Sequence, residues 1–279
     1  MDADNQLSPE LLQRMERRQQ LKRKRRRRKA IGLILTCLLI LVALWKLTSE
    51  LSDKVRSKKE LDTMAAMAVQ ENTTIETAPE EETQEPRQIE VAPIQVDFQE
   101  LWLYYPDIAG WLYCPGTSLN YPVVQTDNNQ YYVHRLPDGR ESAGGSLFVD
   151  CTNTWGYEDA NTVIYGHDMK DGTMFGYLHN FDNQTYYENH PVIYLLSPGC
   201  NYRMDIICTA VVSIDSAPYL KKMDADELQS WLDELERISL IRPMQPINRE
   251  AEHFLTLSTC SYEFEDARFV VIGSLKQIY

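Results

Sequence analysis

One of the six cysteines in this 279-residue chain stands where a nucleophile would be useful. Cys260 ends the apolar run 253–260, and the end of a strand presents its side chain at the rim of a sheet. Cys37 lies in an apolar segment near the N-terminus, so five cysteines remain. In an exported protein an odd number leaves one thiol unpaired. Position and count together indicate Cys260 as the candidate nucleophile.

The other four cysteines have simpler explanations. A buried free cysteine behaves as a small hydrophobic residue, which suits Cys114, Cys151 and Cys208. Cys200 lies in a Ser-Pro-Gly-Cys-Asn turn. The count is compatible with two disulfides among these four cysteines, but their spacing selects no pairing.

A cysteine nucleophile needs a base or cation that favours the thiolate, and a donor for the oxyanion of the tetrahedral intermediate. His167 follows the apolar run 162–165 through Gly166, an arrangement that delivers a side chain to a rim and allows close backbone approach. Arg268 opens the last strand, eight residues after the cysteine, so a hairpin would bring its guanidinium beside the thiol. His167 and Arg268 are therefore the predicted partners.

Other interpretations of these charged and polar residues are simpler. Arg268 would form an ion pair if it met one of the three acidic residues within 263–266, and composition alone favours that pairing. The remaining histidines are expected to be surface or capping residues, and they are His134, His179, His190 and His253.

The elements that must position these residues are mostly short strands. Apolar runs alternate with turn residues such as Pro115-Gly116, which is typical of a β-rich domain. The runs predict eight strands, at 111–113, 121–125, 146–150, 162–165, 192–196, 203–214, 254–259 and 268–275. Eight strands separated by turns favour a barrel or a sandwich.

Two segments of the same domain have helical spacing instead. Apolar residues recur every three to four positions in 98–105, and Pro106 closes that helix. The second helix is 224–239, where the apolar period follows an aspartate cap at Asp224. This helix interrupts the strands shortly before the cysteine.

The chain as a whole joins a basic N-terminal segment to an acidic remainder. Apolar residues make up 43% and charged residues 25%, which excludes wholesale disorder and a protein with many membrane spans. The net charge is −13, yet 11 of the 28 basic residues and 4 of the 41 acidic residues fall within the first 30 positions. The remaining 249 residues are therefore strongly acidic.

This charge asymmetry predicts a membrane anchor. The basic run Lys22–Lys29 directly precedes sixteen uncharged residues that end at Trp45. Positive charge on the cytoplasmic side predicts a cytoplasmic segment 1–29, a single transmembrane segment 30–47 and an extracellular remainder. A cleaved signal peptide fits less well, because the basic region is nearly thirty residues long and no small-x-small cleavage site directly follows Trp45. A nucleic-acid partner is not expected, because a basic run beside an apolar span is a topology signal or a contact to anionic lipid.

The segment between anchor and domain is predicted to be a stalk, 48–95. Its first half has apolar residues at helical spacing, and 70–93 is rich in Glu, Thr, Pro and Gln without an aromatic residue. The folded domain is expected to span 96–279.

Thr256-Leu-Ser-Thr-Cys260 followed by Arg268-Phe-Val-Val resembles the signature of the sortases, membrane-anchored cysteine transpeptidases of Gram-positive bacteria. The resemblance continues upstream, in family order, through 116–125, 127–131, 144–150 and 165–169, and covers about residues 96–279. The Leu-Ser-Thr-Cys variant and the two helices are similar to class B. Asp168 and Ser261 depart from residues common at those positions, and neither belongs to the catalytic triad.

The resemblance implies a fold and a mechanism. The fold would be mainly β with short helices: an eight-stranded sortase-type β-barrel with an N-terminal helix and a long helix inserted before the cysteine strand. Cys260 would attack the carbonyl after Thr in a pentapeptide sorting signal, His167 would move protons, and Arg268 would hold the substrate and the oxyanion. Ser258 and Thr259 would line the groove. No cofactor and no metal are implied.

The same resemblance implies partners and leaves two alternatives. Substrates would be secreted proteins with a C-terminal sorting motif, the acceptor would be an amine of a peptidoglycan precursor or a pilin, and the anchor would contact membrane lipid. One alternative is a Cys-His peptidase that hydrolyses exported peptides. The other is an inactive, membrane-tethered binding module.

Overall fold

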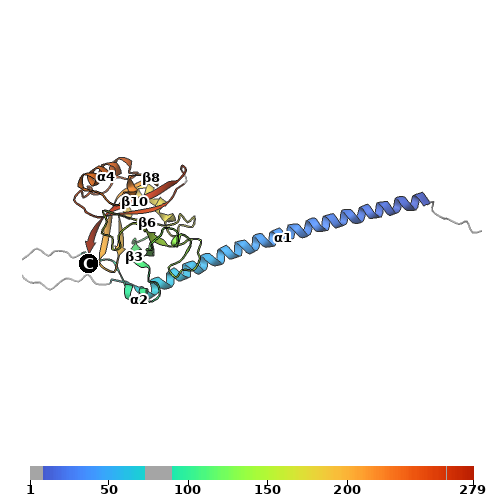
Figure 1. The fold of residues 1–279 in the computed structure, drawn as a ribbon, viewed down its shortest axis with the longest axis horizontal. Coiled ribbons are helices and arrows are strands. Elements are labelled where there is room, and N and C mark those ends of the chain that lie inside the picture. The colour runs from blue at the N-terminus through green and yellow to red at the C-terminus, as the bar shows by residue number, and fades with distance from the viewer. Residues whose placement is uncertain (1–8, 73–89, 262) are drawn as a thin grey trace, which may run out of the picture. The chain divides into compact units, whose positions relative to one another are not determined.

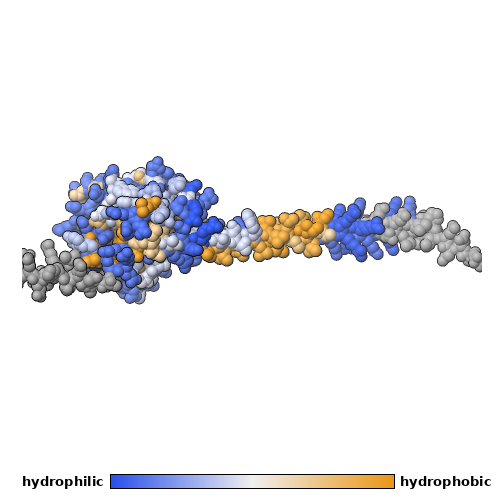
Figure 2. Space-filling view, turned by 90° about the horizontal axis from the view of Figure 1, so that it is seen from below, coloured by the Kyte–Doolittle hydropathy of each residue, from blue (hydrophilic) through white to orange (hydrophobic). Residues whose placement is uncertain are grey.

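The computed structural model describes residues 9–72, 90–261 and 263–279, which fall into two compact units, 1–53 and 54–279. The described part of the first unit is helical and belongs to α1 (Pro9–Ala68) (Figure 1). Large apolar side chains between Ile31 and Leu47 are exposed, and they form the orange band on this helix in Figure 2. By length and composition α1 is able to cross a membrane, in agreement with the predicted anchor.

The second unit begins well before the predicted domain boundary at residue 96. The last turns of α1 belong to it, because Met64 and Ala68 are almost fully buried in a cluster that includes Trp111. The chain then forms β1 (Val69–Glu71), which pairs antiparallel with β2 (Ile94–Val96). Residues 54–72 are thus part of the folded unit rather than of a stalk, and the central part of the predicted stalk, 73–89, lies outside the described residues.

The core of the second unit is a closed eight-stranded barrel, so the predicted fold is confirmed. Each predicted strand is present within a few residues of its expected bounds. The strands are β3 (Ile108–Tyr113), β4 (Asn120–Val124), β5 (Leu147–Val149), β6 (Asn161–Tyr165), β7 (Val192–Leu196), β8 (Asn201–Ser213), β9 (Phe254–Cys260) and β10 (Ala267–Ile278). Around the barrel their order is β10-β8-β7-β3-β4-β5-β6-β9.

Alternation along the last two strands separates two apolar clusters. Leu257 of β9 and Phe269 of β10 point into the barrel, whereas Phe254 and Val270 point outward. Helix α4 (Ala225–Ile238) lies over the barrel near β8 (Figure 1). Its apolar side chains, which include Trp231, cover the outward cluster. Both faces of the cysteine strand are therefore buried over most of its length.

Apart from the end of α1, the helical elements of the second unit are short except for α4, the long helix predicted before the cysteine strand. Asp224 caps α4 through a capping box with Glu227, which confirms the predicted start of that helix. The N-terminal helix α2 is Phe98–Trp102, shorter than the predicted 98–105, and Asp97 caps it. The remaining helical elements are η1 (Tyr132–His134), η2 (Gly176–Asp182), α3 (Gln184–Asn189) and η3 (Ala217–Tyr219).

Candidate active site

The predicted hairpin brings Arg268 directly beside Cys260. The two residues are cross-strand partners in the antiparallel pair β9–β10. The amide of Ser261 donates to the carbonyl oxygen of Ala267 at 3.0 Å, which makes Cys260 and Arg268 a non-hydrogen-bonded pair. This is the closer kind of antiparallel pair, with Cα atoms about 4.5 Å apart, so both side chains leave the same face as neighbours.

The parallel pair β6–β9 brings His167 to the other side of Cys260. Tyr165 lies opposite Ser258, and the amide of Gly166 donates to the Ser258 carbonyl oxygen at 3.1 Å. The pairing with β9 ends at Gly166, and His167 is the next residue along the chain, two positions after the partner of Ser258. The thiol therefore lies between the end of β6 and the start of β10, and the fold brings the three predicted residues together.

Gly166 is where β6 must end, and no larger residue fits there. A Cβ atom on Gly166 would lie 2.5 Å from a methyl group of Leu147 and 2.6 Å from the ring of Phe175. Both neighbours are fully buried, so they have little room to move. A glycine is therefore required at this position by the side chains packed against it.

The ring of His167 is fixed by two contacts. Its Nε2 lies 2.7 Å from the carbonyl oxygen of Val133. A carbonyl oxygen only accepts, so Nε2 donates this hydrogen bond and Nδ1 is the ring nitrogen left for proton transfer. The ring also stacks on His134, with centroids 5.3 Å apart and planes 19° apart. His134 is exposed as expected, yet it packs against the candidate base.

Arg268 is half-buried and does not form the ion pair that was its alternative interpretation. Its Nη1 donates to the carbonyl oxygen of Ala267 at 2.9 Å. Within the described ranges, no ion pair joins Arg268 to Glu263, Glu265 or Asp266. A guanidinium has five N–H donors, so most of them are left to serve a ligand beside the thiol.

Two tyrosines stack against each other on the same face of β9. The rings of Tyr165 and Tyr219 have centroids 6.4 Å apart, and the Tyr219 hydroxyl lies 2.7 Å from the Ser258 hydroxyl. Burial raises the pKa of Tyr219 to about 12, against smaller effects of the Ser258 hydrogen bond and the Arg268 charge. Tyr165 belongs to a motif noted in the sequence, but nothing in the sequence pointed to Tyr219.

Ser258 and Thr259 are buried, with 1% and 2% of their surfaces exposed. Ser258 shares its hydrogen bond with Tyr219, and the Thr259 hydroxyl donates to the Gly166 carbonyl oxygen at 2.9 Å. In this structure the two residues brace the end of β9 against its neighbours. They do not line an open groove, contrary to the expectation, because both side chains are turned into the protein to meet polar partners.

The six cysteines are all free in the structure, so it contains no disulfide. Burial raises the pKa of Cys114 to about 11 and that of Cys208 to about 12, which makes both poor nucleophiles. Cys151, Cys200 and Cys260 are half-buried. Among these three, only Cys260 has an arginine opposite it on one neighbouring strand and a histidine just past the end of the other.

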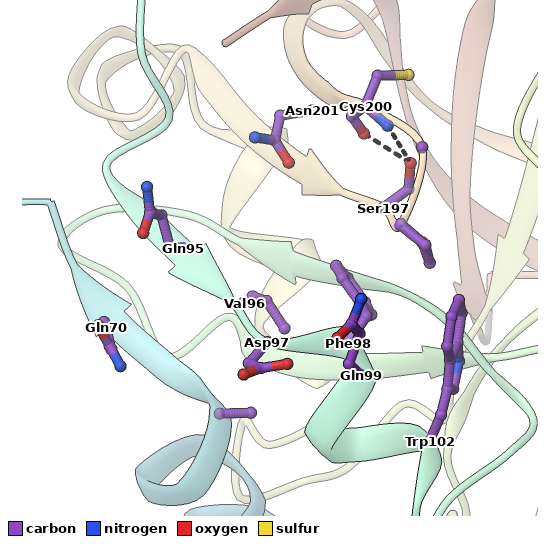
Figure 3. Close-up of a pocket in the computed structure, with 13 residues that line it drawn as sticks. Gln70, Gln95, Val96, Asp97, Phe98, Gln99, Trp102, Ser197, Cys200 and Asn201 are labelled. Atoms are coloured by element: carbon purple, nitrogen blue, oxygen red, sulfur yellow. Dashed lines mark hydrogen bonds between the residues drawn. The ribbon is translucent and has the colours of Figure 1, made fainter.

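A pocket of about 660 Å³ lies elsewhere in the second unit. It is lined by polar and apolar residues of β1, β2 and α2 and by the turn 197–200, with Gln70, Gln95 and Cys200 on its walls (Figure 3). Along β10, Ile278 pairs with Asn201 of β8 beside this pocket, whereas Arg268 is ten residues away. The pocket is therefore at the opposite end of the barrel from the candidate active site.

Asp150 is the buried charge that supports the tyrosine pair. Its Oδ2 accepts from the Tyr165 hydroxyl at 2.9 Å and lies 2.9 Å from Lys221 Nζ, while Oδ1 accepts from Thr152. Burial alone would raise the pKa of Asp150. The hydrogen bonds from Lys221, Thr152 and Tyr165 outweigh burial and lower this pKa to about 2.

Comparison with known proteins gives matches in family, sequence and fold. A family model described as the sortase domain matches residues 112–276. Sortase B of Listeria monocytogenes is 27% identical over 235 residues, which cover 83% of this chain and 89% of the relative. Sortase B of Staphylococcus aureus is 30% identical over 189 residues, which cover 66% and 77%. A structure described as the S. aureus sortase B-substrate complex matches with a TM-score of 0.61 and 29% identity, over 65% of this chain and 85% of that one.

The lowered pKa of Asp150 predicts a pH-dependent part of the stability. With a folded pKa of about 2 and an ordinary value of 3.8, this carboxylate stabilises the fold above pH 4 and loses that effect as the pH falls toward 2. We expect the difference in unfolding free energy between wild type and Asp150→Asn to shrink by about 2 kcal/mol from pH 5 to pH 2. Urea unfolding followed by tryptophan fluorescence measures it.

The control for this experiment is Asp215→Asn, because Asp215 is exposed. The difference in unfolding free energy between wild type and Asp215→Asn is expected to stay nearly constant over the same pH range. A pH-independent difference for Asp150→Asn would contradict the assigned network.

Proposed function

Because the chain belongs to the sortase family, within its class B, we propose that it is a cysteine transpeptidase that acts on exported proteins at the membrane. The observation that carries this proposal is the placement of Cys260 between the end of β6 and the start of β10. That placement gives the thiol a histidine on one side and an arginine on the other.

The reaction follows from these three positions. Nδ1 of His167 first takes the proton of the Cys260 thiol. The thiolate attacks the carbonyl carbon of Thr in the sorting signal, and the oxyanion that forms is held by the Arg268 guanidinium. The C–N bond then breaks, and His167 gives its proton to the departing amine, which leaves a thioester on Cys260. An incoming amine attacks the thioester, His167 takes the amine's proton, and the thiolate is released.

The proposed donors are secreted proteins with a C-terminal sorting motif, and the proposed acceptors are amines of a peptidoglycan precursor or a pilin. The match to a sortase B structure described as a substrate complex supports the peptide class of the donor. The free guanidinium donors of Arg268 suit a peptide carbonyl, which offers oxygen acceptors.

Product analysis separates transfer from hydrolysis. The full chain in detergent micelles is incubated with quenched fluorescent pentapeptides that hold Thr before the scissile bond, with triglycine or Nα-acetyl-lysine as the amine. We expect a ligated product from the wild type and none from Cys260→Ala. Mass spectrometry of the products measures this.

Cys151→Ala is the matched control, because Cys151 is also a half-buried free cysteine, and it is expected to retain ligation. Hydrolysis alone, with both amines present, would favour the Cys-His peptidase. Unchanged ligation by Cys260→Ala would remove Cys260 from the mechanism.

Arg268 is proposed to stabilise the negative charge that develops on the oxyanion in the transition state. Arg268→Lys keeps the positive charge but loses the planar fork that contacts two oxygens. We expect a melting temperature near that of the wild type together with about a hundredfold lower kcat for peptide cleavage. Thermal unfolding and steady-state cleavage of the fluorescent pentapeptide measure the two effects.

The matched control is Arg203→Lys, at an arginine of β8 that forms ion pairs with Glu90 and Asp205. Its turnover should equal that of the wild type. Should Arg268→Lys melt early and turn over normally, Arg268 would be a structural residue.

The anchor and the basic run support a topology with residues 1–29 in the cytoplasm and the second unit outside. Protease added to intact protoplasts should then digest the chain beyond residue 54 and spare the N-terminal segment. Antibodies to the two ends detect the fragments. Protection of the second unit, with digestion only after lysis, would reverse the orientation.

A further inference from the structure

The sequence predicted that His179 is a surface or capping residue. In the structure it lies close to Cys260 itself and to the residues that follow His167 and Arg268. It lies on η2, and its Nε2 is 3.2 Å from the carbonyl oxygen of Cys260. The same nitrogen is 3.7 Å from Oδ2 of Asp168, the residue after His167. Its ring packs on Phe269, the residue after Arg268, with centroids 4.9 Å apart. No other imidazole among the described residues has such contacts.

The strand pattern explains why the Cys260 carbonyl needs a partner. In the non-hydrogen-bonded pair with Arg268, this carbonyl points away from β10 and toward the side on which β6 lies. In a continued parallel ladder, the amide of residue 168 would donate to it, as the amide of Gly166 donates to Ser258. The ladder stops at Gly166, however, and the chain turns away from β9 there.

His179 takes the place of the missing strand neighbour. A carbonyl oxygen only accepts, so Nε2 of His179 carries the proton and donates it to Cys260. The amide of the next residue, Ser261, is bound to the carbonyl oxygen of Ala267. The peptide group between Cys260 and Ser261 is thus held by its oxygen on one side and by its N–H on the other.

The carboxylate of Asp168 and the ring of Phe269 hold the imidazole in place. Their side chains approach it from the β6 end and from β10, and 34% of the His179 side chain and 16% of the Asp168 side chain are exposed. An imidazole that is packed on a ring and lies near a carboxylate has little freedom to leave the carbonyl. Its donor is therefore preorganised toward Cys260.

We propose that His179 is a positioning residue that fixes the backbone of Cys260, and through it the direction of the thiol between His167 and Arg268. The inference rests on the proposed function for its catalytic consequence, but the hydrogen bond itself is independent of activity. A misplacement of the nucleophile by about 1 Å is enough to cost on the order of a hundredfold in rate.

The hydrogen bond has a spectroscopic signature that needs no substrate. Cys260–Ser261 is the only Cys-Ser pair in the sequence, so labelling with ¹³C′-cysteine and ¹⁵N-serine gives one HNCO cross-peak from this peptide group. In the full chain in detergent micelles, His179→Phe keeps a ring against Phe269 but removes the donor. We expect the carbonyl ¹³C resonance to move upfield, and His179→Gln, which restores an N–H donor, to return it.

The kinetic consequence is measured on the same variants with the fluorescent pentapeptide. His179→Phe is expected to lower kcat at least about tenfold with KM unchanged within about twofold, because only the position of the nucleophile changes. His179→Gln should recover kcat to within about threefold of the wild type. The control is His190→Phe, because His190 also contacts a carbonyl oxygen, at 3.0 Å, and packs on Tyr186, at the end of α3. Its kcat should not change.

Several results would overturn the proposal. An unmoved carbonyl resonance in His179→Phe would show that the hydrogen bond is absent, and an unchanged kcat with a moved resonance would show that it positions nothing. Equal losses in His179→Phe and His179→Gln would mean that the imidazole acts in another way. If His179→Phe does not fold, His179→Leu replaces it with the same expectations. Failure of the proposed function would be recognised separately. Cys260→Ala would then keep its ligation, while the carbonyl resonance would still differ between the wild type and His179→Phe.

Discussion

The parallel pairing of β6 with β9, and its end at Gly166, is the constraint on which the rest of the site depends. A side chain at Gly166 would collide with Leu147 of β5 and with Phe175, so only glycine fits at this point of the chain. Beyond this point the chain of β6 turns away, which frees His167 from the sheet and leaves the carbonyl of Cys260 without a strand partner. The antiparallel partner β10 continues, and it keeps Arg268 beside the cysteine.

The packing around this strand end makes it rigid. Closure of the barrel pairs β9 on both sides, and apolar clusters cover both of its faces up to Ser258. Beyond Ser258 the supports are polar: hydroxyls, the carboxylate of Asp150 and the imidazole of His179. A polar, half-buried end on a rigid strand is suited to a nucleophile, because the side chain is accessible while its backbone is held.

The sequence predicted what depends on neighbours in the chain. Alternating apolar residues and turn residues located all eight strands, and the short β9–β10 connection placed Arg268 beside Cys260. The sequence did not predict contacts between elements that are distant along the chain. The helical spacing that includes Met64 was visible in the sequence. The sequence did not show that this turn of α1 packs into the domain. Ser258 looked accessible and His179 looked peripheral for the same reason: their partners come from other elements.

The central claim is that Cys260, held at this strand end, carries the acyl group. The most direct measurement is intact-mass analysis of the full chain after brief incubation with the fluorescent pentapeptide, without an amine and at mildly acidic pH to slow thioester hydrolysis, followed by peptide mapping. The account predicts a mass increase equal to the acyl fragment that ends in Thr, mapped to Cys260 and absent in Cys260→Ala. An adduct on Cys151 or Cys200, or cleavage with no covalent adduct at any time point, would contradict it.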